Sequence, residues 1–245
     1  AKGGDMVNAW ARDRATLFYA GFGLFALAVA VTGFSTTYIA PMARRTFSAP
    51  WFVHVHGAAC VSWIGLVIVQ SMLVRRRRTP LHRRLGQAAI PVALILWSAG
   101  IATQLWATKR DLPTLGPVAA SSLLGTISGL SLYLLLVIAA IVWRRRPDWH
   151  KRLIVLATIQ VLWPAFFRLR HLLPMVPKPE ISLALVLAYS PILVAALRDK
   201  LRYGRIHPVW LFVAPALVIE QSLEVALFGI APWQRAGAWV YAQLG

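Results

Sequence analysis

The chain has 245 residues, of which 58% are hydrophobic and 14% are charged, and its mean hydropathy is +0.63. A water-soluble protein of this length needs more polar surface than this composition supplies, so the soluble classes are excluded. The formal net charge is +18. The basic residues gather in short turns between apolar runs, which gives them an explanation at a membrane surface and argues against a nucleic-acid partner.

Apolar runs of about twenty residues recur along the chain, each long enough to cross a hydrocarbon layer about 30 Å thick. Because backbone in lipid must satisfy its own hydrogen bonds, these runs predict helices. We predict an all-α integral membrane protein with a bundle of seven transmembrane helices. Their expected bounds are 16–40, 51–74, 85–107, 117–143, 153–173, 181–197 and 209–230.

This pattern divides the chain into an N-terminal segment 1–15, a transmembrane domain 16–230 and an interfacial C-terminal tail 231–245. Most of the 26 basic residues fall in the N-terminal segment and in three turns on the same side of the predicted bundle. By the positive-inside rule that side is cytoplasmic, so the N-terminus lies in the cytoplasm and the C-terminus outside. We expect a bacterial cytoplasmic (inner) membrane protein without a cleavable signal peptide.

Each basic turn carries one histidine close to the helix that follows: His82 in "RRRRTPLHRRLG", His150 in "RRRPDWHKRLI" and His207 in "RYGRIHPVW". A helix N-terminus with neighbouring arginines suits a phosphate, most simply that of an anionic lipid head group at the cytoplasmic face. The histidines are then interfacial anchors that cap helices. The alternative is a three-histidine metal site on the cytoplasmic surface, although nothing in the sequence shows that the turns converge.

A second group of ionisable residues lies inside the spans, at similar depths toward the outer end of the bundle at 1.5 Å per residue. Ionisable side chains at such depth cost at least a few kcal/mol unless they are paired or solvated, so they indicate a structural or functional site. The group consists of His54 and His56 in the second span, Arg168 and His171 in the fifth, and Glu220 and Glu224 in the seventh.

Three interpretations of this group are open. The first is a structural ion pair of Arg168 with Glu220 or Glu224. The second is a cofactor site, with His54, His56 and His171 as candidate ligands of a b-type haem, or with His56, His171, Glu220 and Glu224 as candidate ligands of a transition metal. The third is a proton or substrate pathway, for which a helix kinked at Pro164 and buried carboxylates are usual parts.

The positions of the histidines restrict the cofactor interpretation. No span has the two well-separated histidines that a stacked pair of haems needs, which leaves a single haem between the second and fifth helices. His54 and His56 are two residues apart and point about 200° apart on a helix, so both cannot face one site squarely. We expect His56, beside Gly57, to face the bundle.

The fourth span contains "SLLGTISGLS", in which Gly125 and Gly129 form a G-x-x-x-G pattern. Small residues on one face let helices approach closely in lipid, where packing replaces the hydrophobic effect. This face predicts either a central position for the helix in the bundle or a contact with a protein partner.

The stretches "HVHGAACVSWIGLVIVQSMLVRRRRTPLHRRLG", "RRRPDWHKRLIVLATI" and "GRIHP" are similar to a large family of bacterial multi-pass membrane proteins of unknown function. The resemblance covers most of the chain from the second span onward. It implies no activity, and Glu220 and Glu224 are not part of its pattern. The positions that it marks are His54, His56, Gly57, His82, His150 and His207.

Three functional hypotheses follow from the sequence. The leading one is a small membrane protein with a metal or haem at its outer end and a role in redox or oxygen-linked chemistry. The second is a non-catalytic subunit or assembly factor of a larger membrane complex, in which Arg168 and the glutamates serve structure. The third is a membrane-embedded enzyme or transporter that acts on a lipid-like molecule within the bundle.

Overall fold

The computed structural model describes residues 2–245, with side chains from residue 17 onward, so the basic side chains of the N-terminal segment lie outside it. Within this range the chain consists of helices and turns, without a strand. The α-helices are α1 (Lys2–Phe34), α2 (Ala40–Ala43), α3 (Trp51–Arg75), α4 (Thr79–Gly86), α5 (Ala89–Leu115), α6 (Ser121–Val142), α7 (Pro147–Arg168), α8 (Pro179–Ile181), α9 (Ala188–Tyr203), α10 (Ala214–Leu227) and α11 (Ala231–Leu244). The 3-10 segments are η2 (Gly116–Ala120), η3 (Trp143–Arg145) and η4 (Leu169–His171), and the π-helical segments are η1 (Ser35–Ile39), η5 (Ser182–Leu187) and η6 (Val209–Val213).

In the described part of the chain, six helical stretches are long and apolar enough to cross a membrane, which indicates a multi-pass membrane protein. The longest stretch, Thr79–Arg145, contains two of the seven predicted spans. Within it the chain turns at Gly116, whose φ of 62° belongs to the left-handed region, and α6 packs back against α5. The other stretches are Leu17–Ala43, Trp51–Arg75, Pro147–His171, Pro179–Tyr203 and Val209–Leu227.

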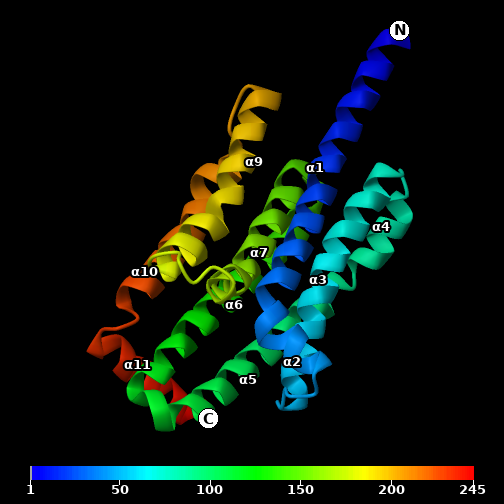
Figure 1. The fold of residues 1–245 in the computed structure, drawn as a ribbon. Helices are drawn as coiled ribbons and strands as arrows, with labels where there is room; N and C mark the ends of the chain where they lie inside the picture. Colours follow the sequence, from blue (N-terminus) through cyan, green and yellow to red (C-terminus); the bar gives the residue numbers. More distant parts are fainter. Residues whose placement is uncertain (1) are drawn as a thin grey trace.

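The long helices run roughly side by side, and Figure 1 shows the two ends of the bundle they form. The upper end in that view holds α4 and the end of α9, and the lower end holds α2, the α5–α6 turn and α11. We call the upper end, with the turns 75–84, 144–152 and 198–208, the basic end. We call the other the far end. The histidine-bearing turns therefore gather at one end, as the sequence predicts.

Helix α7 is the most buried of the membrane-spanning stretches, and it packs against α1, α6 and α9. Its apolar residues Leu153, Leu156 and Ile159 are at most 1% exposed. Its polar residues Arg152 and Gln160 are buried as well, at 3% and 2% exposure. Polar groups in such a position are stable only with partners from neighbouring helices, so α7 organises the interior polar contacts of the bundle.

Two helices end in the same unusual way. Arg45 after α2 and Arg77 after α3 adopt left-handed backbone conformations, with φ of 58° and 57°. At each end the amide of the next residue bonds a carbonyl five residues back, Thr46 N to Pro41 O (2.9 Å) and Arg78 N to Leu73 O (2.9 Å). This is the Schellman arrangement, in which glycine is the usual left-handed residue. Exposed arginines take that place here.

The C-terminal segment forms α11, which packs against α6 and η2 at the far end. The indole N–H of Trp233 donates a hydrogen bond to the Ser121 carbonyl (3.1 Å). Gly237 lies directly on the backbone of Ala120, where a Cβ would collide with the carbonyl group. Trp239 is 66% exposed. The segment predicted as an interfacial tail is thus a helix that lies across the ends of α5 and α6 (Figure 1).

Candidate functional site

A chain of hydrogen bonds joins four helices near the middle of the bundle. Glu220 of α10 accepts bonds from Ser128 Oγ of α6 (2.5 Å) and from Gln160 Nε2 of α7 (3.1 Å). The Gln160 amide oxygen accepts in turn from the hydroxyl of Tyr189 on α9 (3.1 Å). Glu220 lies about 17 Å along the helix from Val209, at 1.5 Å per residue. We call these residues, together with Glu224, the carboxyl site.

Glu220 and Glu224 lie on one face of α10 because they are four residues apart. That face meets the small face of α6. A Cβ at Gly125 would collide with the Glu224 carboxyl group, and one at Gly129 would lie 3.1 Å from Gln160 Nε2. The G-x-x-x-G pattern of α6 therefore makes room for side chains of α7 and α10 of the same protein. This agrees with a central position for α6 in the bundle. The predicted protein partner at this face stays a prediction.

The carboxyl site contains no basic partner among the described side chains. Neither Glu220 nor Glu224 forms an ion pair, since the four salt bridges of residues 17–245 all involve aspartates. Glu224 is 6% exposed, and its Oε2 atom has no hydrogen-bond partner. The amide oxygen of the neighbouring Gln221 is also buried without a partner. A buried and a partly buried acid thus lie within the bundle without a compensating cation, which is costly unless a proton or cation binds there.

The structure does not form the predicted ion pair of Arg168 with Glu220 or Glu224. The Arg168 guanidinium donates to the Pro164 carbonyl one turn earlier (3.1 Å) and lies 4.5 Å from the centre of the Phe34 ring. It therefore faces α1 and not α10. Similar depth in the membrane was the basis of the prediction, but two side chains at one depth meet only when their helices also turn them toward each other.

The histidines of the second span point to different neighbours, as their spacing predicts. His56 faces the bundle, where its Nδ1 donates to the Leu96 carbonyl of α5 (3.2 Å) and its Nε2 lies 3.7 Å from Cys60 Sγ. His54 Nδ1 lies 2.8 Å from the Tyr38 hydroxyl. His171 is exposed in η4. Both ring nitrogens of His56 thus have neighbours within the protein. The assignment of His54, His56 and His171 as haem ligands stays a prediction.

The predicted metal site is not assembled either. Among the described residues, no three His, Cys, Asp or Glu side chains come close enough to hold one ion. His56 is directed to α5, His171 is exposed, and Glu220 and Glu224 face α6. The same holds for His82, His150 and His207 at the basic end, which do not form a three-histidine metal site.

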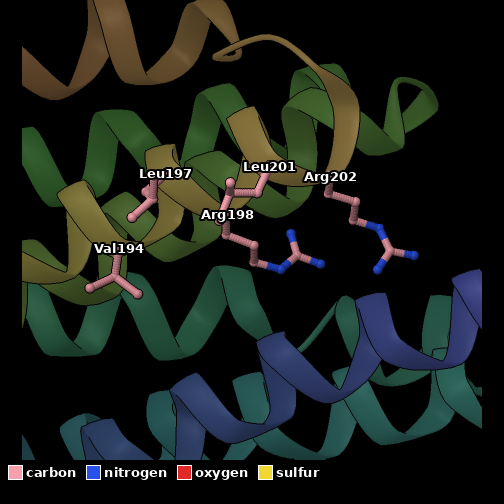
Figure 2. A pocket seen from close by; sticks show the side chains of 5 residues that line it. All are labelled: Val194, Leu197, Arg198, Leu201 and Arg202. Carbon is pink, nitrogen blue, oxygen red and sulfur yellow. The ribbon is translucent and has the colours of Figure 1, made fainter.

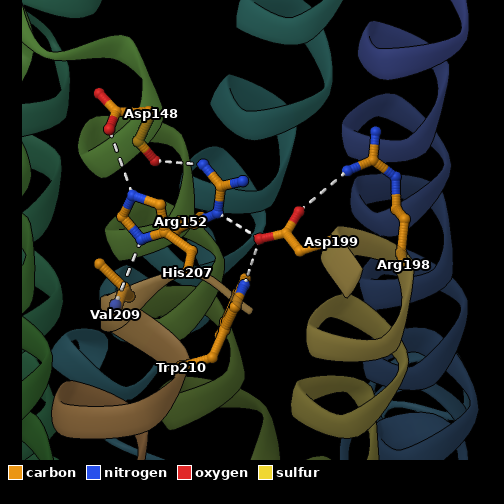
Figure 3. Close-up of polar contacts among 7 residues, drawn as sticks. All are labelled: Asp148, Arg152, Arg198, Asp199, His207, Val209 and Trp210. Atoms are coloured by element: carbon orange, nitrogen blue, oxygen red, sulfur yellow. Dashed lines mark hydrogen bonds and ion pairs between the residues drawn. The ribbon is translucent and has the colours of Figure 1, made fainter. Parts of the chain in front are cut away.

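A second buried polar cluster lies at the basic end, and Figure 3 shows it around Asp199. Asp199 is 1% exposed and its Oδ2 accepts bonds from Arg152 Nε (2.6 Å) and from the indole N–H of Trp210 (2.7 Å). Arg198 Nη1 lies 3.5 Å from the other carboxylate oxygen. Arg152 also donates to the Asp148 carbonyl (2.6 Å). This cluster connects α7, α9 and η6, and the arginines compensate the negative charge of Asp199.

His207 extends the same cluster. Its Nδ1 accepts the backbone N–H of Val209 (3.2 Å), so the proton of the neutral ring is on Nε2, which donates to the Asp148 carboxylate (3.2 Å). Burial lowers the pKa of His207 below its usual range, against the hydrogen bond with Asp148, which raises it. His207 thus caps the following helix, as predicted for an anchor, and it also connects two of the three basic turns (Figure 3).

The other two turn histidines differ from the capping role that the sequence predicts. His150 lies inside the first turn of α7, and its Nδ1 lies 2.7 Å from the Ala140 carbonyl of α6. His82 lies within α4, with a buried Nδ1 that has no hydrogen-bond partner. Neither side chain caps the helix that carries it.

Sequence reasoning missed several residues of both clusters, namely Ser128, Gln160, Tyr189, Arg152, Asp199 and Trp210. Gln160 did carry a signal, since it is the one amide side chain in the apolar run "LIVLATIQVLWPAFF". Asp199 carried none, because "LRDKLRYG" at the end of a span resembles any solvated charged turn.

No family model, curated protein or solved structure matches this chain. The chemistry of the carboxyl site therefore has to be inferred from its own geometry.

Proposed function

We propose that this chain is a seven-span protein of the bacterial cytoplasmic membrane that translocates protons, with the carboxyl site as its intramembrane proton-binding site. The seven-span count takes α5 and α6 as separate crossings, because Gly116 turns the chain between them. The orientation, with the N-terminus in the cytoplasm and the C-terminus outside, follows from the basic turns at one end of the bundle.

One observation carries the proton assignment: the partly buried Glu220 and the buried Glu224 share the face of α10 that packs on α6, and no basic side chain among the described residues forms an ion pair with either. A structural ion pair would supply a cation, and the nearest candidate of the sequence, Arg168, binds elsewhere. A carboxyl pair in an apolar interior is stable when it binds a proton, and it releases that proton when water or another acceptor reaches it.

The two carboxyl groups have different surroundings, which assigns them different roles. Glu220 accepts two hydrogen bonds, from Ser128 and Gln160, and these donors stabilise its negative charge. Glu224 has an oxygen without a donor and therefore carries the proton. The hydroxyl of Tyr189 holds the Gln160 amide in the orientation that donates to Glu220, so the series positions the charged carboxylate between helices.

Infrared difference spectroscopy during a pH titration tests the binding site, since a neutral carboxyl group has a C=O stretching band that an ionised one lacks. The chain has only 8 acidic residues, which keeps this region simple. We expect a band from a buried neutral carboxyl in the wild-type protein and its loss in Glu224→Gln. Asp111→Asn, which changes a partly exposed carboxylate beside Arg110, is the matched control and leaves the band intact. A wild-type protein without the band would refute the proton site.

Translocation is tested separately in vesicles that contain a pH-sensitive dye and are given a potassium diffusion potential. We expect faster proton entry with the wild-type protein and with Asp111→Asn than with Glu224→Gln or with empty vesicles. Equal rates for all four samples would overturn the translocation role. Displacement of the infrared band by added sodium would show that the pair binds a sodium ion in place of the proton.

The redox and subunit hypotheses remain predictions from the sequence. An oxidised-minus-reduced visible spectrum with metal analysis of the same purified sample distinguishes the first from a proton pathway. A Soret band with stoichiometric iron would contradict the proposal of a cofactor-independent site, and His54, His56 and His171 would then be the first ligands to replace.

A further inference from the structure

An open groove runs along α9 at the basic end of the bundle, with a volume of about 430 Å³. Val194, Leu197 and Leu201 supply its apolar lining, and Arg198 and Arg202 supply its charged lining. Figure 2 shows both arginine side chains extending from α9 toward the gap that separates it from α1. The groove is separate from the carboxyl site, and none of its lining residues belongs to that site.

Arg198 is held in this groove with hydrogen-bonding capacity to spare. Its guanidinium lies 4.4 Å from the centre of the Phe18 ring of α1, and Nη1 is 3.5 Å from Asp199. Its Nη2 atom is buried and has no hydrogen-bond partner. A buried guanidinium nitrogen without an acceptor is costly, and a small rotation of the side chain toward the groove would let a ligand oxygen satisfy it.

The surroundings of the groove carry an excess of positive charge. Lys151 lies over the rings of Tyr19 (5.5 Å) and Tyr203 (5.9 Å), and Arg202 lies 5.8 Å from the Tyr203 ring centre. The carboxylate of Asp199 is already taken by shorter bonds from Arg152 and Trp210. The arginines of the groove therefore favour an anionic ligand, and paired guanidinium groups suit the oxygens of a phosphate.

The apolar lining extends the site away from these charges. Val194, Leu197 and Leu201 follow one another at helical spacing on a single face of α9 and are 59%, 58% and 78% exposed. A free phosphate would leave this face unused, whereas a lipid places its acyl chain along it. The face and the arginines together match the two chemical parts of a phospholipid.

We propose that the groove is a binding site for one anionic glycerophospholipid, whose phosphate binds Arg198 and Arg202 and whose acyl chain lies against Val194, Leu197 and Leu201. The lipid phosphate supplies the acceptor that Arg198 Nη2 lacks once this side chain turns toward the groove. This site is specific, in contrast to the general attraction of basic turns to an anionic membrane surface.

Native mass spectrometry of the detergent-purified protein, titrated with phosphatidylglycerol or phosphatidylcholine, measures the binding. We expect a preference for phosphatidylglycerol, and binding about fivefold weaker in Arg202→Gln, the size expected for one basic side chain. Arg202 forms no ion pair among the described residues, so this variant leaves the Asp199 cluster intact. The double variant Arg198→Gln/Arg202→Gln weakens binding further, because both headgroup ligands are then removed.

Leu201→Gln tests the acyl contact, and Arg235→Gln is the control because Arg235 is exposed on α11 at the far end. We expect weaker phosphatidylglycerol binding in the first and unchanged binding in the second. Equal binding of phosphatidylglycerol and phosphatidylcholine would refute the proposed site. An equal loss of phosphatidylglycerol binding in Arg235→Gln and Arg202→Gln would refute it as well. Displacement of the lipid by inorganic phosphate, together with full binding in Leu201→Gln, would show an anion site that does not select lipid.

Discussion

Asp199 and Glu224 are both buried acids in a helical membrane protein, but the structure treats them in opposite ways. Asp199 accepts two short bonds, from Arg152 and Trp210, and has Arg198 beside its second oxygen. Glu224 lies against Gly125, with no basic partner among the described residues and one oxygen without a donor. The first arrangement has the properties of a fixed structural joint, and the second those of a site that exchanges an ion.

The difference shows that burial of an acid does not by itself indicate function. A compensated acid binds neighbouring helices to one another, and its exchange with solvent would break the joint. An uncompensated acid is stable only with a bound proton or cation, so its occupancy responds to conditions. The roles of the two acids can be distinguished by making equivalent substitutions at each and measuring the free energy of unfolding.

The largest effect is expected for Asp199→Asn. Loss of this charge leaves Arg152 buried at 3% exposure without its ion-pair partner, and we expect the free energy of unfolding to fall by about 3–5 kcal/mol. Reversible unfolding in mixed micelles measures it. The exposed Arg83→Gln is the control and should change little. The double variant Arg152→Met/Asp199→Leu removes both charges, and we expect it to recover most of the loss.

Trp210→Phe should have the next largest effect. It keeps the aromatic packing but removes the indole N–H that donates to Asp199 (2.7 Å), a bond to a charged group. We expect a loss of about 1.5–3 kcal/mol in the same unfolding measurement. Trp239→Phe, at an indole that is 66% exposed, is the matched control. An equal loss in both variants would mean that the indole bond does not stabilise the Asp199 cluster.

Gly125→Ala tests the space that α6 leaves for Glu224. The new Cβ would collide with the Glu224 carboxyl group, and we expect a loss of about 1–3 kcal/mol from overpacking. Gly65→Ala, in α3, is the control because a Cβ there meets nothing within 4 Å. Glu224→Ala in the same chain should relieve the collision, so the double variant should be more stable than Gly125→Ala alone.

The smallest effect on stability is expected for Glu224→Gln. Glutamine has the same shape, and no basic partner is left without a charge, so the free energy of unfolding should change by less than about 1 kcal/mol. Proton entry into vesicles should nevertheless be lost. A stability loss as large as that of Asp199→Asn would show that Glu224 also has a structural role. The two acids would then not differ in function as proposed.

Much of the fold could be predicted because hydropathy along the chain is a local property. The apolar runs and the basic turns identified the helices and the end at which the turns gather, and the glutamates stood out in the last long apolar run. Their partners did not stand out, because Ser128, Gln160 and Tyr189 come from three other helices. Only the packing of these helices brings them together.

Arg168 illustrates what depth alone cannot provide. Gln160 and Arg168 are eight residues apart on α7, which turns their side chains about 80° from each other around the helix axis. Gln160 meets Glu220 on α10, while Arg168 meets Phe34 of α1. The sequence gives the height of a residue along its helix, but the rotation of each helix against its neighbours follows from packing of the whole bundle.

The left-handed turns provide a way to determine which face of the membrane each end of the bundle occupies. Arg45, Arg77 and Lys178 are exposed basic residues with positive φ, each in a connection between helices. Trypsin cleaves after Arg45 and Arg77 but not after Lys178, because Pro179 follows it. Arg77 follows α3 at the basic end, and Arg45 follows α2 at the far end. In sealed vesicles of known sidedness, a first cut after Arg77 would identify the basic end as the protease-accessible side, and a first cut after Arg45 would identify the far end.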